Sequence, residues 1–156
     1  MDMYDNLFSQ GCLLNEQVAR QIFEIFPDGG AVMVIVDREG HYWPSDSDAF
    51  AKLNINETTI SDICEKIDDG VEPLITQIDE ISLISGQLVT DRTNCGYVII
   101  AIPQHSPEKA MANIDLLEII LNQVSLIAKL IEKNNMLYEL QLKNQNNLCA
   151  ANVGLN

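Results

Sequence analysis

The sequence predicts an α+β domain in which a central antiparallel sheet of five or six strands is flanked by helices. Two continuous apolar runs, at residues 31–36 and 96–102, have the length and β-branched content of buried strands. Short polar turns separate neighbouring strand segments, and turns of this kind join antiparallel strands. A helical segment precedes the first run and a longer one follows the second, so long N- and C-terminal helices are expected beside the sheet.

Composition and charge restrict the class of protein. The chain has 156 residues, 47% of them hydrophobic, which is enough for one globular domain with its own core. Its 9 basic and 23 acidic residues give a net charge of −14, which disfavours nucleic acid and anionic membranes as partners. No apolar run reaches the roughly 18 residues of a membrane span, and the N-terminus lacks signal-peptide features. We therefore expect a cytoplasmic protein that binds neither membrane nor nucleic acid.

The first third of the chain is expected to form a helix and a hairpin. Asn15 can cap a helix over residues 15–26, which the Pro- and Gly-containing segment 27–30 would end. The apolar run that follows leads into an Asp-to-Gly turn at 37–40 and a return strand at 41–43.

Two short helices and three strands are expected next. Ser47 is a candidate cap for the first helix, and Thr59 resembles the first residue of a capping box for the second. Residues 74–78 and 82–90 have strand patterns, and Gly86 is expected to mark a bulge in the second of them. The apolar run at 96–102 then completes the sheet.

These elements predict one domain over residues 15–142, with a flexible N-terminus at 1–14 and a polar tail at 143–156. The final helix is expected to run from about Ser106 to about Lys143. Its apolar arc covers roughly 220° at 100° per residue, against about 100° for an ordinary surface helix, so one sheet cannot cover it. Either the N-terminal helix covers the remainder or a second copy of the chain does, and we expect a homodimer. The residues expected at the dimer interface are Ile114, Leu117, Leu121, Val124, Ala128, Ile131 and Tyr138; Leu116, Ile119, Leu126, Leu130 and Leu137 lie on an adjacent side.

Several segments resemble the GAF domain family. Residues 96–103 are similar to the last strand of that family, and residues 122–128, 132–134 and 137–141 are similar to its terminal helix. The N-terminal helix, the first apolar strand and its turn are also similar to GAF and to the related PAS domains. The resemblance covers about two thirds of the chain and is weakest over residues 44–80.

The resemblance implies a bacterial-type regulator that takes part in signal transduction. Such domains bind small molecules between the sheet and its variable helices, dimerise through terminal helices and regulate an output domain or a partner protein. The Asn-Lys-X-Asp motif of cyclic-nucleotide-binding members and the bilin-attaching cysteine of phytochromes are not present. The resemblance therefore names neither the ligand nor the partner, and no cofactor is expected.

The candidate ligand-binding residues lie at the start of the variable region. His41 and Trp43 could donate a hydrogen bond and stack on a ligand, although strand packing is the simpler interpretation. Acidic residues nearby could contact a cationic ligand, but acids at helix starts are usually caps, and no His or Cys completes a metal site. The expected set is His41, Trp43, Asp46, Asp48, Phe50 and Asp62.

Catalysis is not expected, because no recognisable catalytic or metal-ligating motif is present. The four cysteines, Cys12, Cys64, Cys95 and Cys149, have no zinc or redox spacing. Two alternatives to a sensory domain remain open. One is a dimerisation scaffold without a ligand, and the other is a thiol-based redox enzyme or sensor that uses Cys64 or Cys95, which would require these two thiols to lie close together.

Overall fold

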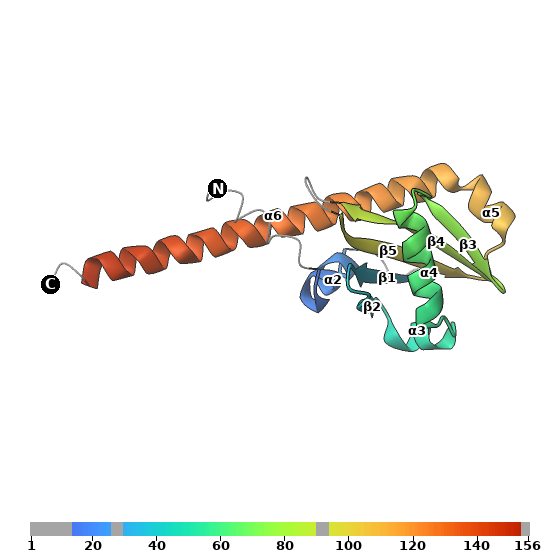
Figure 1. Cartoon of the computed structure of the whole chain (residues 1–156), viewed down its shortest axis with the longest axis horizontal. Coiled ribbons are helices and arrows are strands. Elements are labelled where there is room, and N and C mark those ends of the chain that lie inside the picture. Colours follow the sequence, from blue (N-terminus) through green and yellow to red (C-terminus); the bar gives the residue numbers. More distant parts are fainter. Residues whose placement is uncertain (1–13, 26–29, 90–93, 154–156) are drawn as a thin grey trace.

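The computed structural model describes residues 14–25, 30–89 and 94–153, and these form a three-layered α+β domain with one helix projecting from it (Figure 1). The sheet has the strand order β2-β1-β5-β4-β3, and every neighbouring pair is antiparallel. Its strands are β1 (Val32–Asp37), β2 (Tyr42–Pro44), β3 (Leu74–Ile78), β4 (Ile81–Val89) and β5 (Asn94–Pro103). The expected α+β class and the antiparallel sheet are confirmed, with five strands among the described residues.

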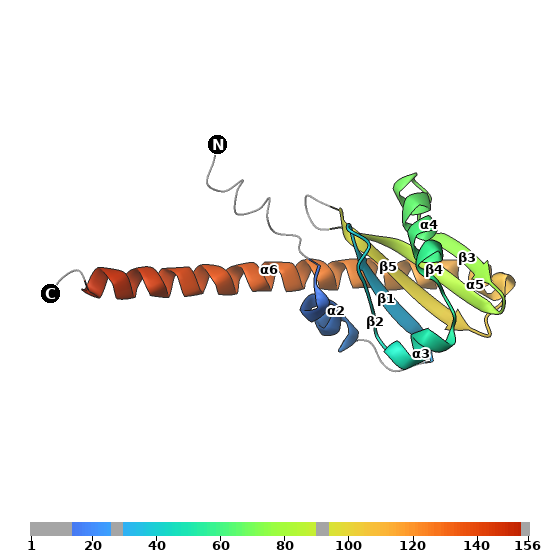
Figure 2. The same ribbon diagram turned by 60° about the horizontal axis from the view of Figure 1, so that its bottom comes forward.

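Helices cover both faces of the sheet (Figure 2). One face is covered by α2 (Glu16–Phe23) and the first half of α6 (Ile114–Val153). The other face is covered by α3 (Ser47–Lys52) and α4 (Glu57–Asp68). A short helix, α5 (Pro107–Ala112), connects β5 to α6.

Alternate residues of the strands supply two separate cores. Ile35, Ile84 and Val98 belong to the core beneath α2 and α6, whereas Val34, Leu83 and Ile99 belong to the core beneath α3 and α4. This division follows from the two-residue period of a strand, and it explains the continuous apolar runs in β1 and β5. Both faces of these two central strands are buried.

Side-chain caps fix where the helices begin, and two of them differ from expectation. Asn15 caps α2 and Ser106 caps α5, as expected. The cap of α3 is Asp46 rather than Ser47, and the cap of α4 is Asn56 rather than Thr59. The Asn56 side chain accepts hydrogen bonds from both the backbone N–H and the hydroxyl of Thr59, at 2.8 and 2.9 Å, so the residue expected to cap instead donates to the cap.

Three further expectations about the elements change. The register shift in β4 lies between Leu88 and Val89 and not at Gly86. The expected single final helix is two helices, because the backbone at Asn113 leaves the helical conformation between α5 and α6. Moreover, α6 continues to Val153, so most of the segment expected to be a polar tail is helical. The expected flexible N-terminus, apart from Leu14, and most of the segment 27–30 that was expected to end the first helix lie outside the described residues, as do residues 90–93.

Candidate functional site

The expected ligand-binding residues do not converge on one site. Trp43 packs against the core beneath α2 and α6, whereas Phe50 is buried in the core beneath α3 and α4. Phe50 instead meets Tyr42, the neighbour of Trp43 in β2, with 5.7 Å between ring centroids. Because adjacent strand residues point to opposite faces, Trp43 and Phe50 are separated by the sheet.

The expected acidic contacts have local structural roles or face solvent. Asp46 accepts the Ala49 backbone N–H at 2.9 Å and so caps α3. Asp48 lies exposed in the first turn of α3, where a carboxylate interacts favourably with the helix dipole. Asp62 is exposed on α4. Each of these three carboxylates therefore has an explanation that requires no ligand.

His41 belongs to a polar group in the β1–β2 turn. Its Nδ1 lies 2.9 Å from Asp37 Oδ2 and 3.7 Å from Glu39 Oε2. Asp37 is itself oriented by the backbone N–H groups of Glu39 and His41. The hydrogen bond that the imidazole donates to Asp37, followed by the charge of Asp37, raises the pKa of His41 above its ordinary value. The three donor atoms lie within 4.8 Å of one another, but such exposed groups are common on surfaces that bind no ion, so we assign no metal to them.

A polar cluster that the sequence did not reveal joins β5, α4 and the β1–β2 turn. The Tyr97 hydroxyl donates to Asp68 at 2.7 Å, and Arg38 Nη1 donates to the Tyr97 oxygen at 2.6 Å and to Asp68 at 3.1 Å. The Arg38 guanidinium also lies 5.7 Å from the centroid of the Tyr97 ring. Burial, and then the hydrogen bond to Asp68, raise the pKa of Tyr97, so its hydroxyl stays protonated. The one signal in the sequence was a single tyrosine within an aliphatic strand.

The thiols do not form the pair that a redox enzyme would need. Cys64 is a free thiol that packs against the α3/α4 core, and burial followed by the charge of Asp68 raises its pKa to about 11. Cys95 lies in the opposite core and is disulfide-bonded. A thiol that stays protonated at neutral pH is a poor nucleophile, and the sheet separates the two sulfurs. Both observations argue against thiol chemistry by this pair.

One buried hydroxyl faces the α3/α4 core without a hydrogen-bond partner among the described residues. Ser85 pairs in the sheet with Leu74 and Ile99, which both belong to that core, and its Oγ is buried. A buried hydroxyl without a partner costs about 1–3 kcal/mol, so this group would gain from a ligand or water that reached it. Ser85 and Tyr97 thus place polar groups within the otherwise apolar core beneath α3 and α4, called here the α3/α4 layer.

A shallow depression lies elsewhere, along α2. It is lined by Asn15, Glu16, Gln17, Arg20, Gln21 and Glu24. All six residues are polar and come from one helix and its cap. None of them belongs to the expected ligand-binding set.

Strand β4 contacts both helical layers and is tied to each of them. Beneath α6, the absence of a side chain at Gly86 allows close approach: a Cβ there would lie 3.3 Å from Leu121 and 3.1 Å from the Glu72 carboxylate. Glu72, from the α4–β3 connection, accepts the Gln87 N–H at 2.9 Å. The Ser125 hydroxyl of α6 donates to the Gln87 carbonyl at 3.0 Å. Gln87 of β4 is therefore hydrogen-bonded both to the α4–β3 connection and to α6.

Helix α6 has two apolar faces with different surroundings. The core face comprises Leu117, Leu121, Val124 and Ala128, which are at most 6% exposed and pack on the sheet and α2. Four of the seven residues expected at a dimer interface are thus already buried within one chain. Of the other three, Ile114 and Ile131 are partly buried and Tyr138 is exposed. The side chains available to a partner are therefore mainly on the other face.

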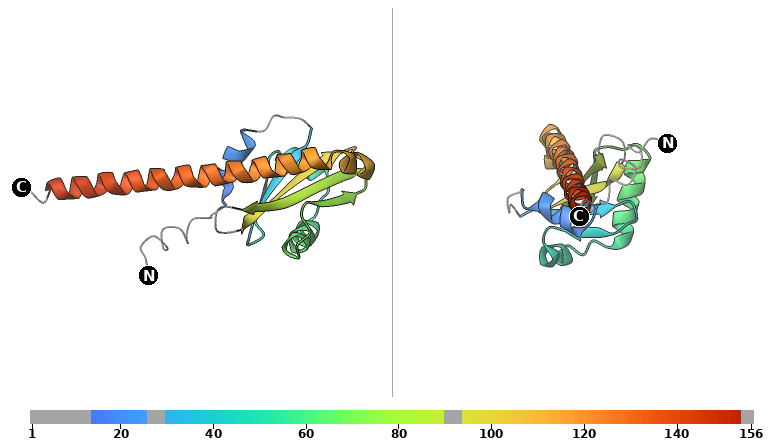
Figure 3. Two further views of the ribbon diagram at one scale, coloured as in Figure 1. Left: turned by 90° about the horizontal axis from the view of Figure 1, so that it is seen from above. Right: turned by 90° about the vertical axis from the view of Figure 1, so that its left-hand side faces the viewer.

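The other face, called here the exposed seam, follows a three- and four-residue spacing along α6. Its six apolar members are between 39% and 61% exposed, and Gln123 and Lys133 interrupt it. In order, the exposed seam is Leu116, Ile119, Gln123, Leu126, Leu130, Lys133, Leu137 and Leu140. It begins where α6 lies on the sheet and continues onto the projecting part (Figure 3).

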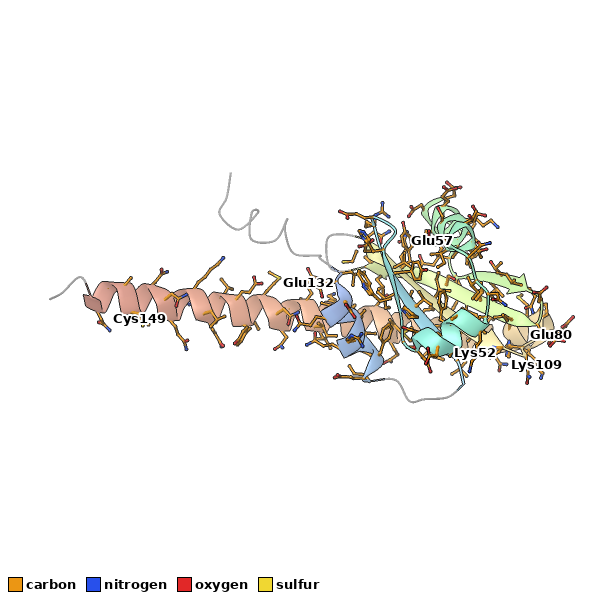
Figure 4. All side chains as sticks on the ribbon, turned by 90° about the horizontal axis from the view of Figure 1, so that it is seen from below. Lys52, Glu57, Glu80, Lys109, Glu132 and Cys149 are labelled. Carbon is orange, nitrogen blue, oxygen red and sulfur yellow. The ribbon has the colours of Figure 1, made fainter. Side chains whose placement is uncertain are left out.

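The projecting part of α6 is largely exposed beyond the described part of the domain. Residues 133–152 are exposed except for Met136, which is partly buried. In Figure 4, Glu132 lies beside α2 at the end of the domain, whereas Cys149 lies far along the projection. The projection covers roughly 30 Å at about 1.5 Å per residue, and a single helix of that length is marginally stable alone in water.

Comparison with known proteins finds no matching family model, curated protein or solved structure. Among the described residues, no helix has both the length and the apolar character of a membrane span.

Proposed function

We propose that the chain is a GAF-like regulatory domain, related in plan to GAF and PAS domains, whose output is helix α6. The observation that carries the proposal is that α6 belongs to the core in its first half and extends into solvent in its second. A change in how the sheet holds the first half would move the second half with it. A domain that works alone as a monomer needs neither the projection nor its exposed apolar residues.

The proposed input is a small molecule or a protein partner at the layer formed by α3 and α4. This layer has the composition of a ligand site, since apolar side chains surround a few polar groups. Ser85 supplies a buried hydroxyl, and the cluster of Arg38, Asp68 and Tyr97 ties one end of α4 to the sheet. This site differs from the one expected from the sequence, of which only Phe50 contributes to it.

Strand β4 provides a physical connection between this input and the output. Ser85 faces the α3/α4 layer, while the next residue, Gly86, lies against Leu121 of α6. Displacement of α4 would shift Glu72 and hence the Gln87 backbone that Ser125 holds. A ligand drives such a shift only if it binds one arrangement of α6 more tightly than the other.

A specific observation favours a second candidate, a dimerisation scaffold without a ligand. Phe50 and Tyr42 contact each other, and the α3/α4 layer is filled with buried apolar side chains. In this candidate α6 has the same role in joining two copies, but nothing in the α3/α4 layer controls it.

Native mass spectrometry of the purified full chain tests the proposal. The regulatory domain predicts a dimer that retains a small molecule or gains one from a cell extract, with changed amide exchange in α6 on binding. A dimer without any adduct, whose α6 exchange is the same before and after exposure to the extract, would identify the scaffold. A monomer at micromolar concentration would contradict both candidates.

A further inference from the structure

The exposed seam has a pattern that specifies how two copies of α6 would pair. Its three- and four-residue spacing extends over about three and a half heptads, which is the spacing of a coiled-coil contact. The two polar interruptions make the pattern directional. The layers formed with a parallel copy therefore differ from those formed with an antiparallel copy.

A parallel pairing in register places every residue against itself. Gln123 would then face Gln123 of the second copy, and Lys133 would face Lys133. Two lysines opposed in one layer of a coiled coil repel each other, and the apolar layers on both sides limit their access to water. This orientation therefore leaves one layer of like charge within the contact.

In an antiparallel pairing whose midpoint lies at the level of Ala128 along the helix, every residue of the seam faces another residue of the seam. Leu126 then meets Leu130 of the second copy, and Gln123 meets Lys133. The two outer layers pair Ile119 with Leu137 and Leu116 with Leu140. Every apolar residue has an apolar partner, and the two polar residues share one layer, where an amide oxygen can accept from an ammonium group.

Charges on and beside the seam agree with the antiparallel arrangement. Asp115 and Lys143 flank opposite ends of the seam, so antiparallel pairing brings opposite charges together and parallel pairing separates them. Lys129 approaches its own copy near the centre, where its long stem can carry the ammonium group out to water. Helix α6 has four acids and three lysines, so it is nearly neutral in a chain whose net charge is −14. Two such acidic chains can therefore approach along α6 with little net repulsion between the helices.

From these observations we infer that α6 joins two copies of this chain in an antiparallel pair centred on Ala128. This inference rests on the dimeric part of the proposed function and adds its orientation and register. In such a pair the projecting half of the seam in one chain packs on the half of the seam beside the domain in the other chain. The whole seam of both chains is then covered. The two domains then lie at opposite ends of the paired helices.

Cysteine crosslinking tests the orientation. Ile119→Cys and Leu137→Cys are prepared separately in the full chain carrying Cys149→Ser, which removes the exposed native thiol. Under mild oxidation neither variant is expected to crosslink alone, whereas a mixture of the two is expected to give a covalent dimer. The Leu116→Cys and Leu140→Cys pair repeats the test at a second layer, in case one substitution prevents folding.

Each of the other outcomes shows which part of the inference is wrong. Crosslinking of each variant with itself would show a parallel pair, which overturns the orientation but leaves a dimeric regulator. A sedimentation dimer without crosslinks at either layer would overturn the seam as the contact. A monomer in sedimentation would overturn both the inference and the dimeric part of the proposed function.

Discussion

The core face and the exposed seam of α6 both present aliphatic side chains at three- and four-residue spacing but differ in their surroundings. Leu121 on the core face is 6% exposed, while Leu130 on the seam is 57% exposed. The core face is held by the sheet and α2, which leave the seam open. An apolar stripe therefore indicates that a partner exists, but only the neighbouring elements show whether that partner is in the same chain.

The largest expected effect comes from truncating the same residue type on each face. Leu121→Ala should lower the free energy of unfolding by about 2–5 kcal/mol, because it leaves a cavity against β4. Leu130→Ala should change it by less than about 0.5 kcal/mol in samples dilute enough to be monomeric. Urea denaturation measures both values. Equal losses for the two variants would remove the distinction between the faces.

A smaller effect is expected where the core face meets the sheet. Gly86→Ala places a Cβ 3.3 Å from Leu121 and 3.1 Å from Glu72, and we expect it to destabilise the fold by about 1–2 kcal/mol. Combining it with Leu121→Ala should cost less than the sum of the single changes, because the crowded side chain is gone. Strict additivity in urea denaturation would show that Gly86 and Leu121 do not constrain each other.

The hydrogen bond from Ser125 to the Gln87 carbonyl should contribute less again. Ser125→Ala should cost about 1 kcal/mol and increase amide exchange around Gln87. Ser125→Thr, which keeps a hydroxyl, is the matched control. If the alanine and threonine variants were equally stable in urea and exchanged alike, the bond would have no part in holding α6 to β4.

The smallest effect concerns His41, which belongs to neither face. Its pKa should lie above its ordinary value, and Asp37→Asn should lower it, because the neighbouring carboxylate stabilises the imidazolium. Any stability that this pair provides is present below the unfolded pKa of about 6.5 and is lost as the pH rises through the folded pKa. Titration of the imidazole by NMR, with the wild type as control, would contradict this if Asp37→Asn left the pKa unchanged.

The sequence was sufficient for the sheet, because strands buried on both faces leave continuous apolar runs. It was less informative where several residues can have the same role. Asp46 and Ser47 are both good caps, and only the backbone decides between them. Likewise, 100° periodicity could define the two apolar faces of α6 but could not say which one lies on the sheet.

The dispersal of the expected ligand-binding residues has a different cause. Trp43 and Phe50 are close in sequence, but strand alternation and the turn into α3 place them on opposite sides of the sheet. Tyr97 and Ser85 enter the α3/α4 layer from strands far along the chain, and no local pattern marks such residues. Strand pairing between segments far apart in the chain brings these residues together, and a short stretch of sequence does not show which strands pair.

Sedimentation equilibrium of three proteins tests most directly the claim that the exposed seam joins two chains. We predict that the wild type is a dimer at micromolar concentration and that Leu130→Glu is a folded monomer. Leu142→Glu changes an exposed leucine of the same helix outside the seam and should remain a dimer. A monomeric wild type, or equal dissociation of the two glutamate variants, would contradict the account.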